Sequence, residues 1–326
     1  MPAKFTHEAD FRQERDFGAK IGATFEFLGA HWRPLGKCLL YFVLPVSLLM
    51  GIGLGLVMNN MFDLMGAAQS NPKAVDPASM FGPSYFSGLG LAMLGGLLAF
   101  IMLMSTVYAY VRLLLNSEAA AAPTPAQVWL EIKARLGRIF AAFGVLVLVY
   151  MVAISLFAGL VALLDAMAFL LMLVVVPALF YLSVPITLYF PVLLLEDGGL
   201  LPALRRSFYL VQGKWWSTFG LLLVAGMIQG MLTIVFILPQ YAVMFGKMLK
   251  VPVLGSDAMG MMAQCFYTSG ILLTYPISLI ALIFQYFNLV ERKEGLGLRS
   301  LVNSLGSGPA PVAYNQAYRP DEEGEY

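Results

Sequence analysis

The sequence predicts an all-α fold: a polytopic membrane bundle of six transmembrane helices, arranged as three pseudo-repeated hairpins. The first observation is composition, because apolar residues make up 60% of the 326 residues and charged residues only 12%. Soluble proteins have about 45–50% apolar and about 25% charged residues. The second is that six apolar stretches are long enough to cross a hydrocarbon core of about 30 Å, which takes about 20 helical residues. The third is an amphipathic stretch before every second span, expected on the cytoplasmic side.

The expected spans divide the chain into an arm, a membrane domain and a tail. Residues 1–16 form a cytoplasmic arm, residues 17–303 the six-span domain, and residues 304–326, rich in Gly, Pro and Tyr, a disordered cytoplasmic tail. The third and fourth spans must break near residues 164–165, because one helix of their combined length does not fit a bilayer. We place the spans near residues 35–58, 88–115, 139–163, 166–195, 217–239 and 265–290.

The distribution of Lys and Arg predicts the orientation of these spans. Only Lys73, Lys247 and Lys250 of the 20 basic residues follow the first, third or fifth span. Cytoplasmic segments of membrane proteins carry an excess of Lys and Arg, so both termini are expected in the cytoplasm. Tryptophans favour the membrane interface. All four lie at this same predicted face: Trp32, Trp129, Trp215 and Trp216.

A short motif recurs before the first, third and fifth spans. The segments GAHWRPLG (29–36), GRIFAAFG (137–144) and GKWWSTFG (213–220) all fit G-x-x-aromatic-x-x-Leu/Phe-G. The ends of two returning spans are also alike, since TVYAYVRLLLN (106–116) aligns with TLYFPVLLLED (187–197). Three copies of one unit would explain this: an amphipathic helix, an outgoing span, a loop and a returning span. Chance similarity between Gly- and aromatic-rich membrane borders is the alternative.

Three stretches have the spacing of amphipathic helices that lie in the membrane interface. In the first, Phe17 and Phe25 are expected on the apolar stripe and Lys20 outside it. In the second, the stripe runs from Val128 to Ile139. The three stretches are residues 17–30, 127–139 and 200–212.

Basic and aromatic residues of these segments form a candidate interface for anionic lipid headgroups or a partner protein. Lys and Arg there would attract phosphate, and Trp would lie at headgroup level. A structural cuff that only anchors and spaces the hairpins is the other interpretation. The candidate interface residues are Trp32, Arg33, Arg135, Arg138, Arg205, Arg206, Lys214, Trp215 and Trp216.

A second candidate site lies within the membrane. Prolines interrupt the fourth and sixth spans, and broken helices can form transporter sites or can simply curve around their neighbours. Polar side chains there can bind a ligand or only join two helices by hydrogen bonds. The candidate intramembrane polar site, which would enclose a ligand-sized cavity, comprises Pro185, Tyr189, Gln229, Tyr275 and Pro276.

Small residues four positions apart predict close contacts between helices. Such contacts can form within one chain or between the copies of a homo-oligomer. The pattern occurs at Gly51 and Gly55, at Gly88, Ala92 and Gly96, and at Gly226 and Gly230.

The residues point to no enzyme, cofactor or metal. His7 and His31 are not part of a zinc-protease motif, and the sequence has no nucleophile elbow or nucleotide-binding loop in a meaningful context. Glu196 and Asp197 are adjacent carboxylates, which we expect to be a solvated cap at the end of the fourth span. Methionines in residues 240–264 are expected to be apolar filling, although thioethers can also bind Cu(I). A net charge of +1 excludes nucleic-acid binding through bulk charge.

The stretch PVLLLEDGGLLPALRRSFYLVQGKWWSTFG (191–220) resembles the signature of a bacterial membrane-domain family. That domain occurs fused to some glycerophosphodiester phosphodiesterases and also alone, as uncharacterised six-span proteins of the Bacteroidetes type. The resemblance implies six spans in a bacterial inner (plasma) membrane. It does not imply phosphodiesterase activity, because nothing here supplies the metal-binding residues of that enzyme. The matching residues are Pro191, Glu196, Ala203, Leu204, Arg206, Ser207, Gly213 and Trp216.

These observations predict an integral membrane protein that organises lipids or partner proteins and does not catalyse a reaction. The alternative is a transporter of small molecules or lipids that uses the proline-broken fourth and sixth spans. Membrane lipids with anionic headgroups, a protein partner or a second copy of the chain are the expected binding partners.

Overall fold

A computed structural model describes residues 5, 8–70, 81–116, 122–164, 168–196 and 198–295. It confirms the all-α fold, since the described residues form helices and no β-strand. Six of these helices are long and apolar enough to cross a membrane. The tail 304–326, His7, and Asp165 at the expected break between the third and fourth spans lie outside the described residues.

Two of the described helices, α2 and α10, begin at a side-chain cap. Asp16 precedes α2 and accepts a hydrogen bond from the backbone N of Ala19 at 2.7 Å. Ser256 precedes α10 and accepts one from the backbone N of Met259 at 3.3 Å. Such caps satisfy backbone donors that have no partner within the helix. The described helices are α1 (Glu8–Phe11), α2 (Phe17–Phe42), α3 (Leu44–Ser70), α4 (Pro83–Asn116), α5 (Pro125–Leu164), α6 (Ala168–Thr187), α7 (Tyr189–Leu195), α8 (Leu200–Val211), α9 (Trp215–Met248), α10 (Asp257–Thr274) and α11 (Pro276–Glu294).

Two returning spans are broken next to a proline. α6 and α7 are separated at Leu188, three residues after Pro185, and α10 and α11 are separated at Tyr275, directly before Pro276. Proline lacks the backbone N–H that an uninterrupted helix needs, and it disfavours helical geometry in the residue before it. Pro177, by contrast, lies inside α6 without a break.

The first hairpin begins differently from the sequence-based expectation. α2 continues through the expected start of the first span and ends only at Val43, two residues before Pro45. The first apolar helix of membrane length is therefore Leu44–Leu64 rather than 35–58. The second amphipathic stretch is likewise continuous with its span in α5, and only the third forms a separate helix, α8.

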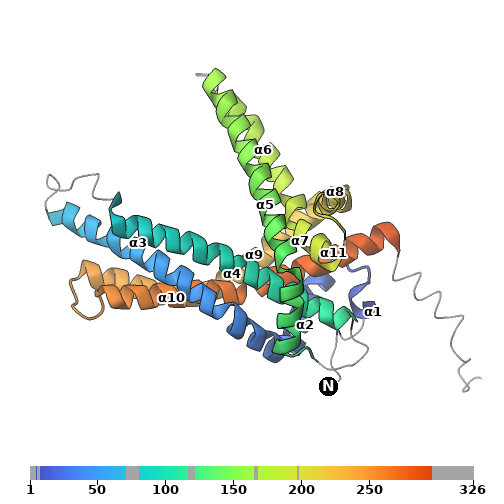
Figure 1. Ribbon diagram of the computed structural model, residues 1–326, viewed down its shortest axis with the longest axis horizontal. Coiled ribbons are helices and arrows are strands. Elements are labelled where there is room, and N and C mark those ends of the chain that lie inside the picture. Colours follow the sequence, from blue (N-terminus) through green and yellow to red (C-terminus); the bar gives the residue numbers. More distant parts are fainter. Residues whose placement is uncertain are drawn as a thin grey trace, which may run out of the picture.

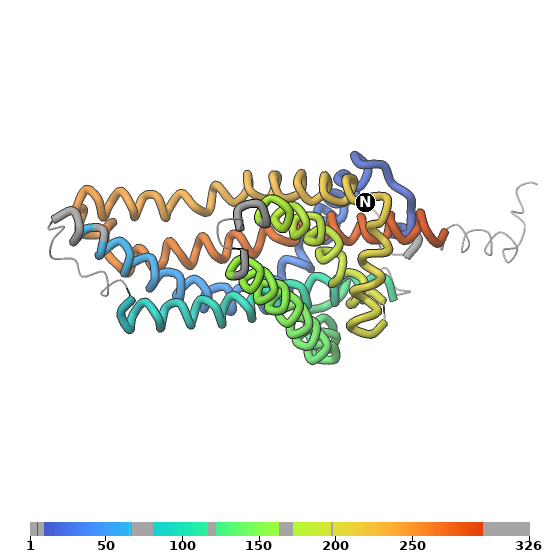
Figure 2. Tube along the Cα trace, turned by 90° about the horizontal axis from the view of Figure 1, so that it is seen from above, coloured from blue at the N-terminus to red at the C-terminus, as the bar shows by residue number. Residues whose placement is uncertain are grey.

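Four helices, α3, α4, α9 and α10, lie side by side as an elongated bundle (Figures 1 and 2). Glycines permit the close approach of α3 to its neighbours. A Cβ on Gly53 would lie 2.3 Å from the backbone N of Ala92 in α4, and one on Gly51 would lie 2.7 Å from Cα of Cys265 in α10. The expected small-residue contacts thus form within the chain at these helices. A Cβ at Gly226 or Gly230 would meet only open space.

The hairpin of α5 and α6 diverges from this bundle and contacts the rest of the chain mainly at its base (Figure 1). Its outward side chains are apolar and exposed, including Leu148 at 65%, Ile154 at 62% and Leu173 at 59%. Soluble monomers do not expose apolar surfaces of this extent. The exposed apolar side chains of this hairpin match a lipid environment.

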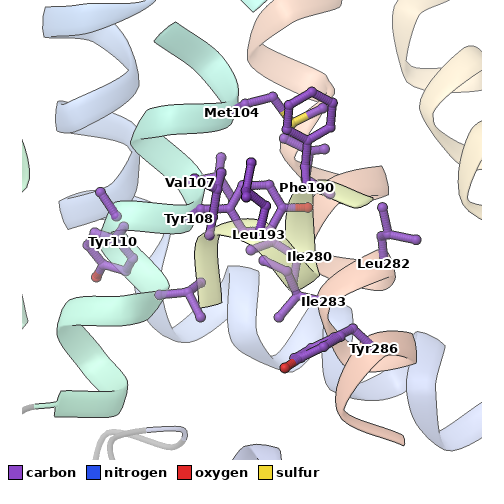
Figure 3. Close-up of a cluster of buried hydrophobic side chains, with 14 of the residues drawn as sticks. Met104, Val107, Tyr108, Tyr110, Phe190, Leu193, Ile280, Leu282, Ile283 and Tyr286 are labelled. Atoms are coloured by element: carbon purple, nitrogen blue, oxygen red, sulfur yellow. The ribbon is translucent and has the colours of Figure 1, made fainter. Parts of the chain in front are cut away.

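The largest apolar core lies at the base, where α4, α7 and α11 meet (Figure 3). Tyr108 of α4, Leu193 of α7 and Ile283 of α11 are all at most 1% exposed. The N-terminal arm joins the same core: the ring of Phe11 stacks on Phe284 at a centroid distance of 5.7 Å. The described part of the arm is therefore packed against α11 and is not a free extension.

Candidate functional site

Four side chains from three helices meet around Glu196, the residue that ends α7. Its Oε2 lies 2.5 Å from Nε of Arg206 in α8, and its Oε1 accepts a hydrogen bond from the hydroxyl of Tyr286 in α11 at 2.7 Å. Arg206 Nη1 also lies 2.8 Å from Oε1 of Glu294. Burial opposes the charge of Arg206, but the hydrogen bonds with Glu294 and Glu196 outweigh burial and raise the pKa of Arg206. We call these four residues the corner network.

The corner network corrects the expectation for Glu196. A solvated cap would leave this carboxylate free in water, whereas here it binds Arg206 and Tyr286. Asp197, its expected companion, lies outside the described residues.

Two further arginines bind the backbone at the end of α7. Arg112 of α4 donates from Nη1 to the carbonyl of Leu194 at 3.0 Å. Arg138 of α5 donates from Nη2 to the carbonyl of Glu196 at 3.4 Å and also to that of Gly198. The last carbonyls of a helix have no partner within it and carry partial negative charge, so cationic donors stabilise them.

A second ion-pair set joins α4 to α5. Glu131 Oε1 lies 3.3 Å from Nε of Arg112 and 2.7 Å from Nε of Arg135. Three of the expected interface residues, Arg135, Arg138 and Arg206, are thus bound to groups of the protein itself. Carboxylates bind Arg135 and Arg206, and backbone carbonyls bind Arg138, which favours a structural role for all three.

Lys20 is buried at the junction of α2, α9 and α11, with 2% of its surface exposed. Its Nζ donates to Oε1 of Gln285 at 2.7 Å and to Oγ of Ser217 at 3.3 Å. Gln285 in turn donates from Nε2 to Oγ1 of Thr218 at 2.8 Å. Burial lowers the pKa of Lys20, as do the nearby charges of Arg292 and Lys214, whereas Asp16 raises it. The sequence placed Lys20 outside the apolar stripe of this helix, whereas in the structure it is buried.

The remaining cations of the expected interface face outward together with two tryptophans. Trp32 is 63% exposed and Trp216 is 76% exposed. The guanidinium of Arg33 lies over the ring of Trp32, 5.1 Å from its centroid. Arg205 and Lys214 are also exposed. We call these five residues the outer cation set.

Trp215 belongs to neither group, because it packs inside the protein. Its ring stacks on Tyr181 of α6 at a centroid distance of 5.5 Å and on Phe219 at 5.3 Å. Its indole N–H donates to the carbonyl of Tyr181 at 2.9 Å. Trp215 therefore joins α9 to the α6 side of the diverging hairpin.

A groove of about 530 Å³ runs along α2 where it faces the break between α10 and α11. We call it the α2 groove. Its walls are mainly apolar, and three polar or amphipathic side chains lie among them. The lining residues are Leu28, Trp32, Arg33, Leu35, Gly36, Lys37, Leu39, Leu40, Leu273, Pro276 and Ile277.

The expected intramembrane polar residues are not brought together around one cavity. Gln229 of α9 accepts a hydrogen bond from the hydroxyl of Ser278 at 2.6 Å, which joins two helices. Tyr189 is fully buried in the core, and its hydroxyl has no hydrogen-bond partner in the described part of the chain. The rings of Tyr275 and Phe100 pack edge to face, with their centroids 6.2 Å apart. Of the five candidates, Pro276 lines the α2 groove, and Pro185 precedes the break in α6.

No family model, curated protein or solved structure matches this chain. The residues that carry the resemblance in the stretch 191–220 nevertheless have a clear local role. Glu196 and Arg206 form the ion pair of the corner network, and Ala203 and Ser207 are the buried side of α8. Gly213 ends the turn after α8 with φ of 80°, a conformation that favours glycine. The motif residues thus build the corner between α7 and α9.

Sequence reasoning missed the polar residues of α11. Gln285, Asn288 and Glu291 are all buried, and each interrupts an otherwise apolar run. Their spacing of three residues was the available signal, because it places them on adjoining positions of one helix face. Asn288 Oδ1 accepts a hydrogen bond from the backbone N of Arg15 at 2.8 Å, so this face binds the N-terminal arm.

Proposed function

We propose that the protein is an integral membrane protein of a bacterial inner membrane that gathers anionic lipids around its cytoplasmic end. One observation carries this proposal: the fold compensates the charge of its inner arginines but leaves the outer cation set exposed. Arg33, Arg205 and Lys214 lie outward, and the tryptophans Trp32 and Trp216 lie among the most exposed aromatic residues. This combination is typical of a surface in contact with phospholipid headgroups.

The energetics support a lipid role more than a catalytic one. A Lys or Arg near an anionic membrane surface contributes about 1 kcal/mol of attraction. The corner network joins α8, the helix that carries Arg205, to the end of α7 and to α11. A rigid base that presents cations at headgroup level would select anionic lipids from the surrounding bilayer.

A lipid-enrichment measurement tests the proposal. The protein is reconstituted in vesicles with equal amounts of phosphatidylglycerol and phosphatidylcholine, extracted gently, and the retained lipids are quantified. We expect phosphatidylglycerol to be enriched, and the double variant Arg205→Gln, Lys214→Gln to lower this enrichment by about twofold to fivefold. Arg206 is left unchanged, because its loss would disrupt the corner network.

Lys250→Gln is the matched control, since Lys250 is an exposed cation after α9, at the opposite end of the bundle. The Lys250→Gln variant should enrich phosphatidylglycerol as much as the unchanged protein does. Equal enrichment in all three proteins would contradict the proposal. Retention of a partner protein that the double variant loses would assign the outer cation set to protein recognition instead.

The helix breaks at Leu188 and Tyr275 favour transport as a second candidate, because broken helices can form binding sites within a membrane. The region between these breaks is filled by the core around Phe190, Leu193 and Ile280 (Figure 3). A transporter would have to open this packed core. We therefore favour lipid binding.

A further inference from the structure

The α2 groove combines two cations with an apolar wall. Arg33 and Lys37 are four residues apart and therefore lie on the same side of α2. Leu35 and Leu39, at 2% and 5% exposed, also line the groove and contribute apolar surface to it. A volume of about 530 Å³ is within the range of small-molecule sites in proteins.

Within the described ranges of the chain, no carboxylate forms an ion pair with either cation of the groove. Arg33 contacts Trp32, whose ring can hold the guanidinium in place without neutralising it. This arrangement differs from that of Arg206, which is bound by two carboxylates. Both exposed cations are therefore accessible to an anionic group.

The opposite wall supplies an apolar surface at the break between α10 and α11. Leu273, Pro276 and Ile277 form this wall. The groove opens beside Leu40, which is 50% exposed and continues the apolar surface toward the membrane-length part of the bundle. A hydrocarbon chain can therefore lie in the groove and continue into the lipid around it.

We propose that the α2 groove binds one anionic phospholipid of the surrounding membrane, with its phosphate on Arg33 and Lys37 and one acyl chain between α2 and the start of α11. Phosphate matches the charge of the two side chains, and the apolar walls match an acyl chain but not a water-soluble anion. The inference rests on the proposed function and narrows it to a defined site. The site shares Trp32 and Arg33 with the outer cation set, and it differs from the rest of that set in holding one defined lipid.

Native mass spectrometry with added phosphatidylglycerol or phosphatidylcholine tests the site. We expect the unchanged protein to retain one phosphatidylglycerol in preference to phosphatidylcholine. Arg33→Gln, Lys37→Gln should weaken this binding about tenfold, because two charge-assisted hydrogen bonds are lost. The double variant Arg205→Gln, Lys214→Gln should bind the single phosphatidylglycerol as the unchanged protein does. The same variant should lower the general enrichment of anionic lipid. If the unchanged protein shows no general enrichment of anionic lipid but still retains one phosphatidylglycerol, the proposed function is contradicted and the groove is supported.

Two further measurements identify the occupant. Ile277→Trp narrows the apolar wall and should weaken phosphatidylglycerol binding without removing a charge. A photo-reactive benzoyl-phenylalanine in place of Leu40 should form an adduct with the mass of one phospholipid. A crosslink to the chain itself, to a second copy or to another protein would overturn the proposal. Equal lipid retention by the Arg33 and Lys37 double variant and by the unchanged protein would also overturn it, even where the general enrichment persists.

Discussion

Glu196 and Arg206 form an ion pair across the corner between α7 and α8, with Oε2 and Nε 2.5 Å apart. The two side chains are 24% and 31% exposed, so water screens their attraction only in part. Tyr286 donates to the same carboxylate at 2.7 Å, which connects the corner to α11. The pair therefore fixes the direction in which the chain leaves the fourth span.

Replacing Glu196→Gln should lower the free energy of unfolding by about 1–3 kcal/mol, because Arg206 loses a half-buried counter-charge. The melting temperature of the detergent-purified protein should fall by a few degrees. Asp63→Asn is the control, since Asp63 is 66% exposed and lies 3.5 Å from Lys247. Exposed pairs contribute little, so this control should melt like the unchanged protein. If the Glu196 variant has the same melting temperature as the unchanged protein, the corner network does not stabilise the fold.

Lys20 should make stability depend on pH. Its pKa in the fold is lowered from the ordinary value of 10.5, chiefly by burial, so the folded protein loses this proton at lower pH than the unfolded chain. Just below 10.5 the unfolded chain binds more protons, and stability therefore rises as pH increases through that window.

The measurement compares the unchanged protein with Lys20→Gln between about pH 8 and about pH 10. Other groups titrate in both proteins and cancel in the difference. We expect the difference in melting temperature, unchanged protein minus variant, to increase as pH rises. A difference that stays constant over this range would mean that Lys20 has an ordinary pKa in the fold.

Gly53→Ala should disrupt the contact between α3 and α4. The added Cβ would lie 2.3 Å from the backbone N of Ala92 and 2.7 Å from its Cα, and backbone atoms cannot move aside as a flexible side chain can. Overpacking of this kind costs about 1–3 kcal/mol or more. Gly90→Ala is the matched control, because a Cβ there meets nothing within 4 Å. A melting temperature of the Gly53 variant equal to that of the control would contradict the close approach.

Cysteine labelling in intact cells tests the orientation and the hairpin of α5 and α6. In a protein without Cys38 and Cys265, an impermeant maleimide should label Lys250→Cys from outside. It should label Arg205→Cys only after the membrane is permeabilised. Ile154→Cys should remain unlabelled in both cases, because this exposed apolar position would lie in hydrocarbon. Labelling of Arg205→Cys in intact cells would place the termini outside.

The apolar helices and some of their faces could be predicted from the sequence, since both depend on local patterns. In α5, Val128, Ile132 and Ile139 are at most 1% exposed, as the expected stripe requires. The prolines indicated the break in the sixth span at Pro276, but in the fourth span only Pro185 lies near the break, whereas Pro177 and Pro191 lie inside helices. The hydropathy of a span and the effect of a proline both depend on residues that are close together in the chain. A single sequence is therefore sufficient to predict them.

The contacts of the charged residues could not be predicted, because their partners are distant in sequence. Lys20 is buried since Gln285 approaches it from α11, while Phe17 and Phe25 of the expected apolar stripe are 41% and 44% exposed. Apolar side chains at a membrane border are stable outside as well as inside, so hydrophobicity no longer decides which face of α2 is buried. The polar partners on α11 decide it instead.

The order of helices in the chain has a consequence for biosynthesis. α11 is the last described helix, and it belongs to the membrane-length segment with the largest share of buried side chains. A ribosome delivers α4 and α7 to the bilayer before α11 exists, so the faces around Tyr108 and Leu193 must remain against lipid until translation reaches Pro276. These two faces therefore gain their buried contacts with α11 only after the earlier hairpins have been made.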